Sequence, residues 1–229
     1  MSAPVSVIAI DGPSGSGKGT IARRVADQLG WHLLDSGALY RLVGLAAYQR
    51  GVDLGDHPTL TKIAAHLDVS FGMDASGHEQ IQLAGEEISG DLRTEAAGER
   101  ASVVAAIPGV RAALLERQRR FAQPPGLVAD GRDMGTVVFP AAPLKIYLTA
   151  TAEERALRRY NQLKDKEVDG SLAALFAQVA RDVAERDHRD LNRAIAPLKP
   201  AVDAVIVDST SMSVDEVVQR VLGLWAERR

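Results

Sequence analysis

A glycine-rich segment near the start of the chain carries the residue types that hold phosphate groups. Its three inner glycines let the backbone curl so that successive N–H groups converge on one concavity, which favours an anion. A lysine adds a positive charge beside that concavity. The spacing predicts a cradle for a nucleotide triphosphate, made of Gly12, Pro13, Ser14, Gly15, Ser16, Gly17, Lys18, Gly19 and Thr20.

A strand and a helix flank this segment. Val5–Ile10 is a β-branched apolar run with one polar exception, as in a central parallel strand buried on both faces. Apolar residues recur at helical spacing from Lys18 onward, so the positive end of a helix faces the concavity. The strict pattern G-x-x-x-x-G-K-[ST] fails at one position, because Gly19 follows the lysine and the hydroxyl arrives at Thr20. A glycine-rich turn that binds nothing would need strand, helix and lysine to coincide by accident.

Two further segments place charged residues beside expected strands. Asp130 ends a buried strand in the manner of a Walker B acid, and Arg132 and Asp133 follow it. Arg41 falls in the first turns of a helix, close to the carboxyl end of the preceding strand, where open α/β sheets bind ligands. A plain surface arginine is the alternative for Arg41.

The third charged segment, 181–193, ends a long helix and contains four arginines and four acidic residues. It can be a solvated helix with ion pairs between residues four apart. However, Arg186, Asp190 and Arg193 are spaced i, i+4 and i+7 and would share one face. There, guanidinium groups could bind phosphates and the carboxylate could bind sugar hydroxyls. Both interpretations stay open at this point.

These residues favour phosphoryl transfer. Its barrier falls mainly through alignment and neutralisation of charge, so the site needs many cations around one point. Lys18, Arg41, Arg132 and the arginines of two late helices supply them. No conventional base is evident, and a phosphate acceptor needs none, because its oxygen is already anionic near neutral pH. The pattern therefore favours a kinase over a hydrolase.

The elements that would position these residues alternate along the chain. Core strands are expected at 5–10, 31–34, 126–130, 145–148 and 204–208, with helices between them. This order predicts an α/β fold with a doubly wound, five-stranded parallel sheet and helices on both faces. Residues 51–98 break the pattern with a short helix and glycine-separated antiparallel strands, which indicates an inserted subdomain. Later helices are expected at 97–107, 110–121 and 152–162, from about 171, and after the N-cap Ser213.

Composition narrows the class of protein further. At 229 residues the chain is long enough for one large α/β domain with insertions. The net charge of −3 gives no global attraction to nucleic acid or to an anionic membrane, and the absence of cysteine excludes disulfides and thiolate chemistry. No apolar run approaches a membrane span and no signal peptide is evident, so we expect a cytoplasmic protein.

Four segments resemble the bacterial type of cytidylate kinase across nearly the whole chain. They read GPSGSGKGT, LLDSGALYR, ADGRDMGTVVFP and RDHRDLNRAIAPL, and the GKGT form is similar to nucleoside monophosphate kinases in general. The resemblance implies ATP-dependent phosphorylation of CMP and dCMP, with Mg²⁺ and a closing lid. It also implies a P-loop kinase core at 1–50, 99–159 and 171–229, a nucleotide-monophosphate-binding insertion at 51–98 and a lid at 160–170.

The resemblance also implies roles for individual residues. Those matching the family's monophosphate site are Ser36, Arg41, Ser102, Arg111, Arg132, Asp133, Arg186, Asp190 and Arg193. Among them, Ser102, Arg111 and Asp133 would lie near cytosine, Asp190 and Arg186 near the sugar, and Arg41, Arg132 and Arg193 near phosphates. We expect Lys18, Arg132, Arg186 and Arg193 to be catalytic, and Arg158 and Arg159 to join the loop at ATP. Thr20 and Asp130 are the expected Mg²⁺ ligands, directly or through water.

Other functions remain as alternatives. A UMP- or AMP-preferring kinase would share the cradle and the cations. A nucleotide-gated switch would need a conformational loop and an interaction surface, and a nucleic-acid-processing ATPase would need a basic, aromatic-bearing groove; none of these is identified in the sequence. The expected substrates are therefore small molecules, with no nucleic acid and no membrane as partners, and the expected form is a monomer.

Overall fold

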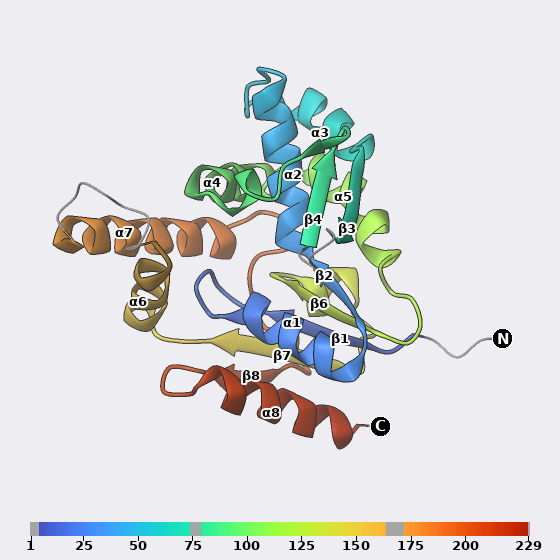
Figure 1. Ribbon diagram of the computed structural model, residues 1–229, viewed down its shortest axis with the longest axis vertical. Coiled ribbons are helices and arrows are strands. Elements are labelled where there is room, and N and C mark those ends of the chain that lie inside the picture. Colours follow the sequence, from blue (N-terminus) through green and yellow to red (C-terminus); the bar gives the residue numbers. More distant parts are fainter. Residues whose placement is uncertain (1–4, 74–78, 164–171, 229) are drawn as a thin grey trace. The chain divides into compact units, whose positions relative to one another are not determined.

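The computed structural model describes residues 5–73, 79–163 and 172–228 (Figure 1). The chain divides into two compact units. One, here called the sheet unit, joins Met1–Asp35 to Arg119–Arg229, and the other, the helical unit, is Ser36–Gln118. Among the described residues, no helix is both long and apolar enough to cross a bilayer.

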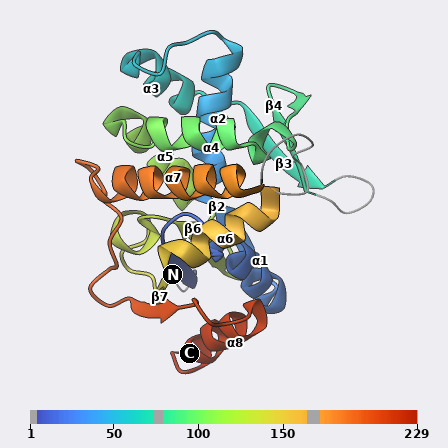
Figure 2. The same cartoon turned by 90° about the vertical axis from the view of Figure 1, so that its left-hand side faces the viewer.

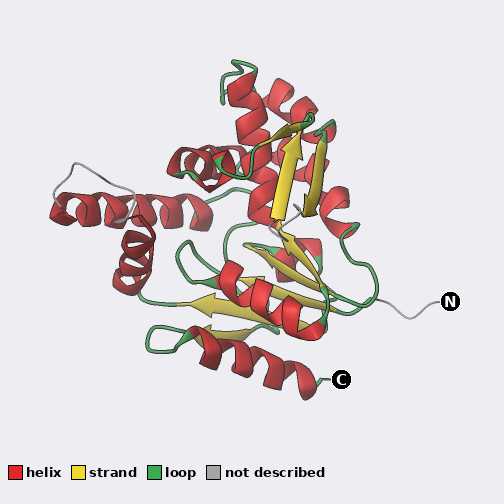
Figure 3. Cartoon of the chain, viewed as in Figure 1, coloured by secondary structure: helices red, strands yellow, loops and turns green. Residues whose placement is uncertain are grey.

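The sheet unit contains the predicted five-stranded parallel sheet (Figure 3). Its strands are β1 (Val7–Asp11), β2 (His32–Asp35), β6 (Leu127–Gly131), β7 (Leu144–Thr149) and β8 (Val205–Asp208). They lie in the order β2-β6-β1-β7-β8, so β1 is central, as its uninterrupted apolar run predicts. Every residue of β1 and β6 is buried. Ile10 pairs with Asp130 and Asp11 with Gly131, which brings the carboxyl ends of the two strands together.

Four long helices and one wide turn complete the sheet unit. They are α1 (Lys18–Leu29), the single π-helical turn η2 (Met134–Val138), α6 (Ala152–Leu163), α7 (Leu172–Leu191) and α8 (Val214–Ala226). Helices α1 and α8 pack together over the sheet, and α6 packs against α7 (Figure 2). The core between the sheet, α1 and α8 is aliphatic, for example Ile10, Ile21, Val25 and Val221. About 25 cal/mol per Å² of apolar burial makes such a face the main attachment of each helix.

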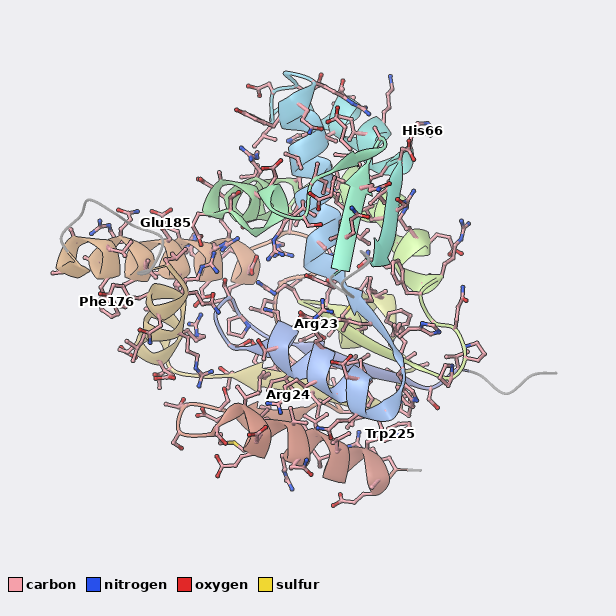
Figure 4. All side chains as sticks on the ribbon, in the orientation of Figure 1. Arg23, Arg24, His66, Phe176, Glu185 and Trp225 are labelled. Carbon is pink, nitrogen blue, oxygen red and sulfur yellow. The ribbon has the colours of Figure 1, made fainter. Side chains whose placement is uncertain are left out.

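Local signals set the ends of α1 and α8. Ser213 caps α8 with a reciprocal capping box to Glu216, as its sequence predicts. Gly30 ends α1 in the left-handed region with φ of 63°, and its N–H returns to the last turn. Arg24 of α1 reaches Asp215 at the start of α8 at 2.7 Å, and Trp225 lies near the other end of α8 (Figure 4). The two helices are therefore joined by charge as well as by apolar contact.

The end of α7 differs from the prediction. We expected Arg186, Asp190 and Arg193 to share one helical face, but α7 ends at Leu191, so Arg193 lies beyond the helix. The Asn192 side-chain amide donates to the His188 carbonyl at 2.8 Å, and that carbonyl also accepts from the Asn192 backbone N–H at 3.1 Å. The returning chain then supplies the Leu198 N–H to the Asp190 carbonyl at 2.8 Å.

The helical unit holds α2 (Ser36–Gln49), α3 (His57–Ala65), η1 (Asp91–Arg93), α4 (Glu95–Val104) and most of α5 (Pro108–Arg119). It also contains the antiparallel strands β3 (Val69–Met73), β4 (Glu79–Leu83) and β5 (Glu86–Glu87). The short antiparallel strands within 51–98 agree with the prediction. Pro108 opens α5 instead of lying between two helices, because its missing N–H costs nothing in a first turn.

The compact unit is longer than the insertion predicted at 51–98. Its first helix, α2, packs against α3 and α4 of the same unit, so the unit begins at Ser36. The assignment of 51–98 as a nucleotide-monophosphate-binding subdomain stays a prediction. So does the lid at 160–170: its first four residues, 160–163, end α6, and the remainder lies outside the described residues.

Candidate active site

The glycine-rich loop after β1 has the conformation that its sequence predicts. Gly15 and Gly17 adopt φ of 75° and 87°, the left-handed region that other residues rarely enter. A Cβ on Gly12 would lie 2.1 Å from the Leu148 carbonyl oxygen, so any larger residue would displace the end of β7. Gly17 is also the N-cap of α1. The loop therefore presents backbone N–H groups at the positive end of a helix, as an anion site requires.

Lys18 is the buried cation of this loop. Its Nζ donates to the Pro13 carbonyl at 3.1 Å, across the loop. Its pKa is lowered from 10.5 to about 8, chiefly by burial and also by Arg132, while Asp130, Asp190 and Asp35 partly offset that change. Nearby, the Ser16 hydroxyl is buried and has no hydrogen-bond partner among the described residues. An anion in the loop would both partner that hydroxyl and raise the pKa of the lysine.

Two arginines of α6 support the loop from outside. Arg158 donates to the Ser16 carbonyl at 3.2 Å and to the Ser209 carbonyl at 2.6 Å. Arg155 donates to the Ser14 carbonyl at 2.9 Å and forms a buried ion pair with Asp187 of α7. Their guanidinium groups hold the loop backbone, since each donates to a loop carbonyl. Sequence reasoning missed Arg155, although the run Arg155, Arg158, Arg159 marks α6 as cationic.

The two arginines of α6 that were predicted to contact ATP instead bond protein groups in this structure. Arg158 donates to the Ser16 carbonyl, to Glu154 and to Ser209, and Arg159 donates to the Gln162 side chain at 2.8 Å. Contact of either arginine with ATP stays a prediction.

Arg132, Asp190 and Arg193 form a buried ion network. Arg132 Nε donates to Asp190 Oδ2 at 2.8 Å, and Arg193 donates to Asp190 Oδ1. The side chains of Asp190 and Arg193 are each 5% exposed, and that of Arg132 is 23% exposed. The predicted grouping of Arg186, Asp190 and Arg193 on one helical face therefore differs from this geometry, in which Asp190 pairs with Arg193 beyond the helix and with Arg132, 58 residues away. A joint functional role of these residues stays a prediction.

The charges of this network stabilise one another. Burial raises the pKa of Asp190, but Arg132 and Arg193 outweigh it and hold that pKa below its ordinary value of 3.8. Burial would lower the pKa of Arg132, yet Asp190, Asp130 and Asp11 raise it. Asp190 and Arg132 are thus both ionised at neutral pH. The network carries two positive charges against one negative, so it retains net attraction for a phosphate.

Asp130 has the placement of a metal-organising carboxylate. It is buried near the end of β6, and a Cβ on Gly19 would lie 3.2 Å from its Oδ2. Its oxygen thus borders the position that carries Ser or Thr in a strict Walker A loop. Thr20, one residue later, is exposed on α1. Carboxylate and hydroxyl oxygens beside a phosphate loop fit the preference of Mg²⁺ for hard oxygen ligands.

The remaining predicted residues divide between the units. Asp133 is buried immediately before η2, and Arg186 is half-buried on α7. In the helical unit, Ser36 is buried at the start of α2 and Arg41 is half-buried on the same helix. The structure therefore gathers the loop, Asp130, the ion network and Asp133 within the sheet unit.

Two base-site candidates of the helical unit are also buried. The Ser102 hydroxyl on α4 has no partner among the described residues. Arg111 of α5 donates to the Ala105 carbonyl at 3.1 Å, and its guanidinium carbon lies 5.7 Å from the centre of the Tyr40 ring. A buried hydroxyl without a partner is costly, so Ser102 fits a ligand-binding role.

The fold and this site define a P-loop phosphotransferase: a central parallel strand leads through a glycine loop into a helix, beside buried lysine and arginine. A family model described as cytidylate kinase matches residues 8–227. The chain belongs to the cytidylate kinase family, whose members are ATP-dependent nucleoside monophosphate kinases.

Named relatives match the chain along its full length. A cytidylate kinase of Pseudomonas fluorescens is 60% identical over 100% of this chain and 98% of its own. Those of Stutzerimonas stutzeri and Pseudomonas putida are 58% and 57% identical, over 98% and 100% of this chain and 97% and 99% of their own. These matches confirm the resemblance drawn from the four motifs.

Proposed function

We propose that this chain transfers the γ-phosphoryl group of ATP to CMP or dCMP, giving CDP or dCDP. Family membership along the whole chain carries this proposal. The buried lysine in the phosphate loop and the Arg132–Asp190–Arg193 network in the same unit support it, because they supply the cations that phosphoryl transfer requires.

The phosphate loop holds the donor in this proposal. Backbone N–H groups of the loop residues that follow Pro13 and the Lys18 ammonium would bind the β- and γ-phosphates of ATP, and the Ser16 hydroxyl would gain a partner. Lys18 stabilises charge on the group in transfer. Arg158 and Arg159 would complete the donor side.

The arginines hold the acceptor and the group in transfer. Arg132 and Arg193, fixed by Asp190, would face the acceptor phosphate and the transferring phosphoryl group, and Arg186 would join them from α7. No side chain needs to remove a proton, because the acceptor oxygen is already anionic. Arg41 would bind the acceptor phosphate from the helical unit.

The nucleoside is recognised by polar side chains. Asp133, Ser102 and Arg111 would read cytosine, while Ser36, Asp190 and Arg186 would contact the remainder of CMP. Asp133 accepts hydrogen bonds only, and so would favour the amino group of cytosine over the carbonyl of uracil.

Thr20 and Asp130 would hold Mg²⁺, directly or through water. The ion would supply charge neutralisation at the ATP phosphates when bound. This placement is supported by the approach of Asp130 to the backbone at Gly19. We further propose that the enzyme is a monomer that works in the cytoplasm, where ATP is available.

A coupled assay of the full chain with ATP, Mg²⁺ and each nucleoside monophosphate tests the proposal. We expect CMP and dCMP to give the highest kcat/KM, and ATP hydrolysis without acceptor to be slow, because water lacks the bound acceptor's alignment. A higher kcat/KM for UMP or AMP would establish the alternative kinase. Light scattering after size exclusion tests the monomer.

A further inference from the structure

Asp11 is a buried carboxylate that the mechanism above does not use. It is the last residue of β1 and immediately precedes the phosphate loop. The backbone N–H groups of Met134 and Gly135 donate to its Oδ1 and Oδ2, each at 2.8 Å. Both oxygens are thus directed at a segment more than a hundred residues away in the sequence.

The segment that Asp11 holds is the turn that follows Arg132 and Asp133. Met134 and Gly135 are the first two residues of η2, whose opening N–H groups have no partner within the turn. Arg119 donates to the Val138 and Val137 carbonyls at the other end, at 3.1 and 3.3 Å. A carboxylate at the N-terminal end and a guanidinium at the C-terminal end both interact favourably with the dipole of the turn.

Space around this contact is restricted. A Cβ on Gly135 would lie 3.4 Å from Asp11 Oδ2 and 3.1 Å from Lys145 Cδ. The two 2.8 Å hydrogen bonds hold the backbone against the carboxylate. Because Asp133 immediately precedes the held N–H groups, its backbone has little freedom to shift while both bonds are intact.

We propose that Asp11 is a positioning residue for base selection: its carboxylate fixes the start of η2, and thereby aims Asp133 and Arg132 at the acceptor nucleotide. This inference rests on the proposed role of Asp133 in reading cytosine. It adds that selectivity depends on a residue of the donor-side strand that touches no substrate. Since Asp11 is followed by Gly12, one residue connects the ATP loop to the base-reading segment.

The ionisation of Asp11 provides an independent way to test its positioning role. Its pKa is raised from 3.8 to about 6, chiefly by burial and also by Asp133, while the N–H groups of Gly135 and Met134 and the charge of Arg132 partly offset the rise. Tyr147 on the neighbouring strand β7 also interacts electrostatically with Asp11, and the Lys145 side chain of that strand borders Gly135 as Asp11 does. Protonation of Asp11 puts a hydroxyl on one of its two carboxyl oxygens. That hydroxyl would face an N–H donor, so one of the two hydrogen bonds to η2 is lost in acid.

The experiment measures kcat/KM for CMP and for UMP in Asp11→Asn. The amide keeps the shape but accepts only one of the two N–H groups. We expect the CMP-to-UMP ratio to narrow by about tenfold, because a loosened Asp133 distinguishes the bases less well. Arg119→Met is the matched control: it loosens the far end of η2, and should lower the melting temperature while changing the ratio by less than about twofold.

A double variant separates positioning from general loosening. If Asp11 acts through Asp133, Asp11→Asn combined with Asp133→Asn should narrow the ratio no further than Asp133→Asn does alone. Additive narrowing, or an unchanged ratio in folded Asp11→Asn, would overturn the inference. Wild-type enzyme without preference for CMP would instead defeat the proposed function itself.

The wild-type enzyme provides a second measurement if Asp11→Asn does not fold. Its CMP-to-UMP ratio should narrow between pH 7.5 and 5.5, as Asp11 takes up a proton around its pKa of about 6. The two substrates carry the same phosphate, so phosphate ionisation cancels in the ratio. A ratio that is constant over this range would contradict the positioning role.

Discussion

The phosphate loop and the Arg132–Asp190–Arg193 network solve the same electrostatic problem in different ways. The loop is one continuous segment, whose shape follows from glycines at positive φ and from the close approach of Gly12 to β7. The network joins side chains from the β6–η2 junction and from the end of α7. Backbone dipoles bind anions at little energetic cost, whereas the network buries three charges that depend on one another.

This difference predicts different consequences of mutation. Losing a charge from the loop removes stabilisation that is largest in the transition state, and leaves the fold nearly intact. Losing a charge from the network leaves partners buried without compensation, so stability and binding should both fall. The following variants test this contrast.

Lys18→Ala should have the largest effect on turnover. We expect kcat to fall by about 10²–10³, as when one preorganised donor is removed, and the KM for ATP to change much less. The melting temperature should stay close to that of the wild type, because burial of the ammonium is unfavourable to folding, as its lowered pKa indicates. Near-normal turnover would contradict the assignment of this loop.

Asp190→Ala should act on stability and substrate binding together. Arg132 and Arg193 would lose their common partner, at a cost of about 2 kcal/mol, which corresponds to about thirtyfold if it appears in KM for the acceptor. Urea unfolding and the KM values for CMP and dCMP measure both effects. Asp190→Asn is the isosteric control that keeps one acceptor oxygen.

The same variant distinguishes two roles of Asp190. If it contacts the sugar, CMP and dCMP should be affected unequally, because they differ in one hydroxyl. If it only holds the two arginines, both KM values should rise in parallel. Unchanged KM values for both substrates would mean that Asp190 does not act on substrate binding. It would then be part of a simple ion pair that stabilises the helix by about 0.3–0.5 kcal/mol, the alternative drawn from the sequence.

Asp133→Asn should have a smaller and more selective effect. The amide retains the shape and adds a donor for the uracil carbonyl, so CMP activity should fall while the CMP-to-UMP ratio of kcat/KM narrows by about tenfold, or roughly 1.4 kcal/mol. Steady-state kinetics on both nucleotides provide the test. An unchanged ratio would transfer base discrimination to Ser102 or Arg111.

The contrast also explains what the sequence could predict. The loop and the five strands were predictable, because glycine spacing and apolar periodicity act over neighbouring residues. The partner of Asp190 was not, since Arg132 reaches it across the fold. Helical periodicity grouped Arg193 correctly with Asp190 but for a wrong reason, because α7 ends at Leu191 and Arg193 lies beyond it.

The roles of Asp11 and Arg155 could not be predicted from the sequence either. Each looks ordinary in the sequence: Asp11 ends a strand as Asp130 does, and Arg155 is one of several arginines on α6. Their importance comes from backbone groups that they meet only after folding, namely the N–H groups of η2 and the Ser14 carbonyl. A carboxylate that ends a central parallel strand is the signal that could have drawn attention to Asp11.

The pH dependence of activity should give the smallest effect and the most direct view of the loop's electrostatics. With a pKa of about 8 in the substrate-free enzyme, the protonated fraction of Lys18 falls as pH rises, so kcat/KM for ATP should drop by about fourfold between pH 7 and 8.5. Bound phosphates raise that pKa, so the corresponding fall of kcat should begin at a higher pH than the fall of kcat/KM. Lys18→Arg, whose guanidinium stays charged, should not show this fall of kcat/KM with rising pH, even if its turnover is low.

Loss of activity in that range would not reflect unfolding caused by this group. The unfolded chain keeps the Lys18 proton up to its ordinary pKa of 10.5, while the folded protein releases it near 8. Between these values the unfolded state binds more protons, so this lysine makes folding more favourable as pH rises. Urea unfolding of wild type and Lys18→Arg at pH 7 and 9 should show a relative gain for the wild type, and a relative loss would mean that burial does not lower the pKa of Lys18.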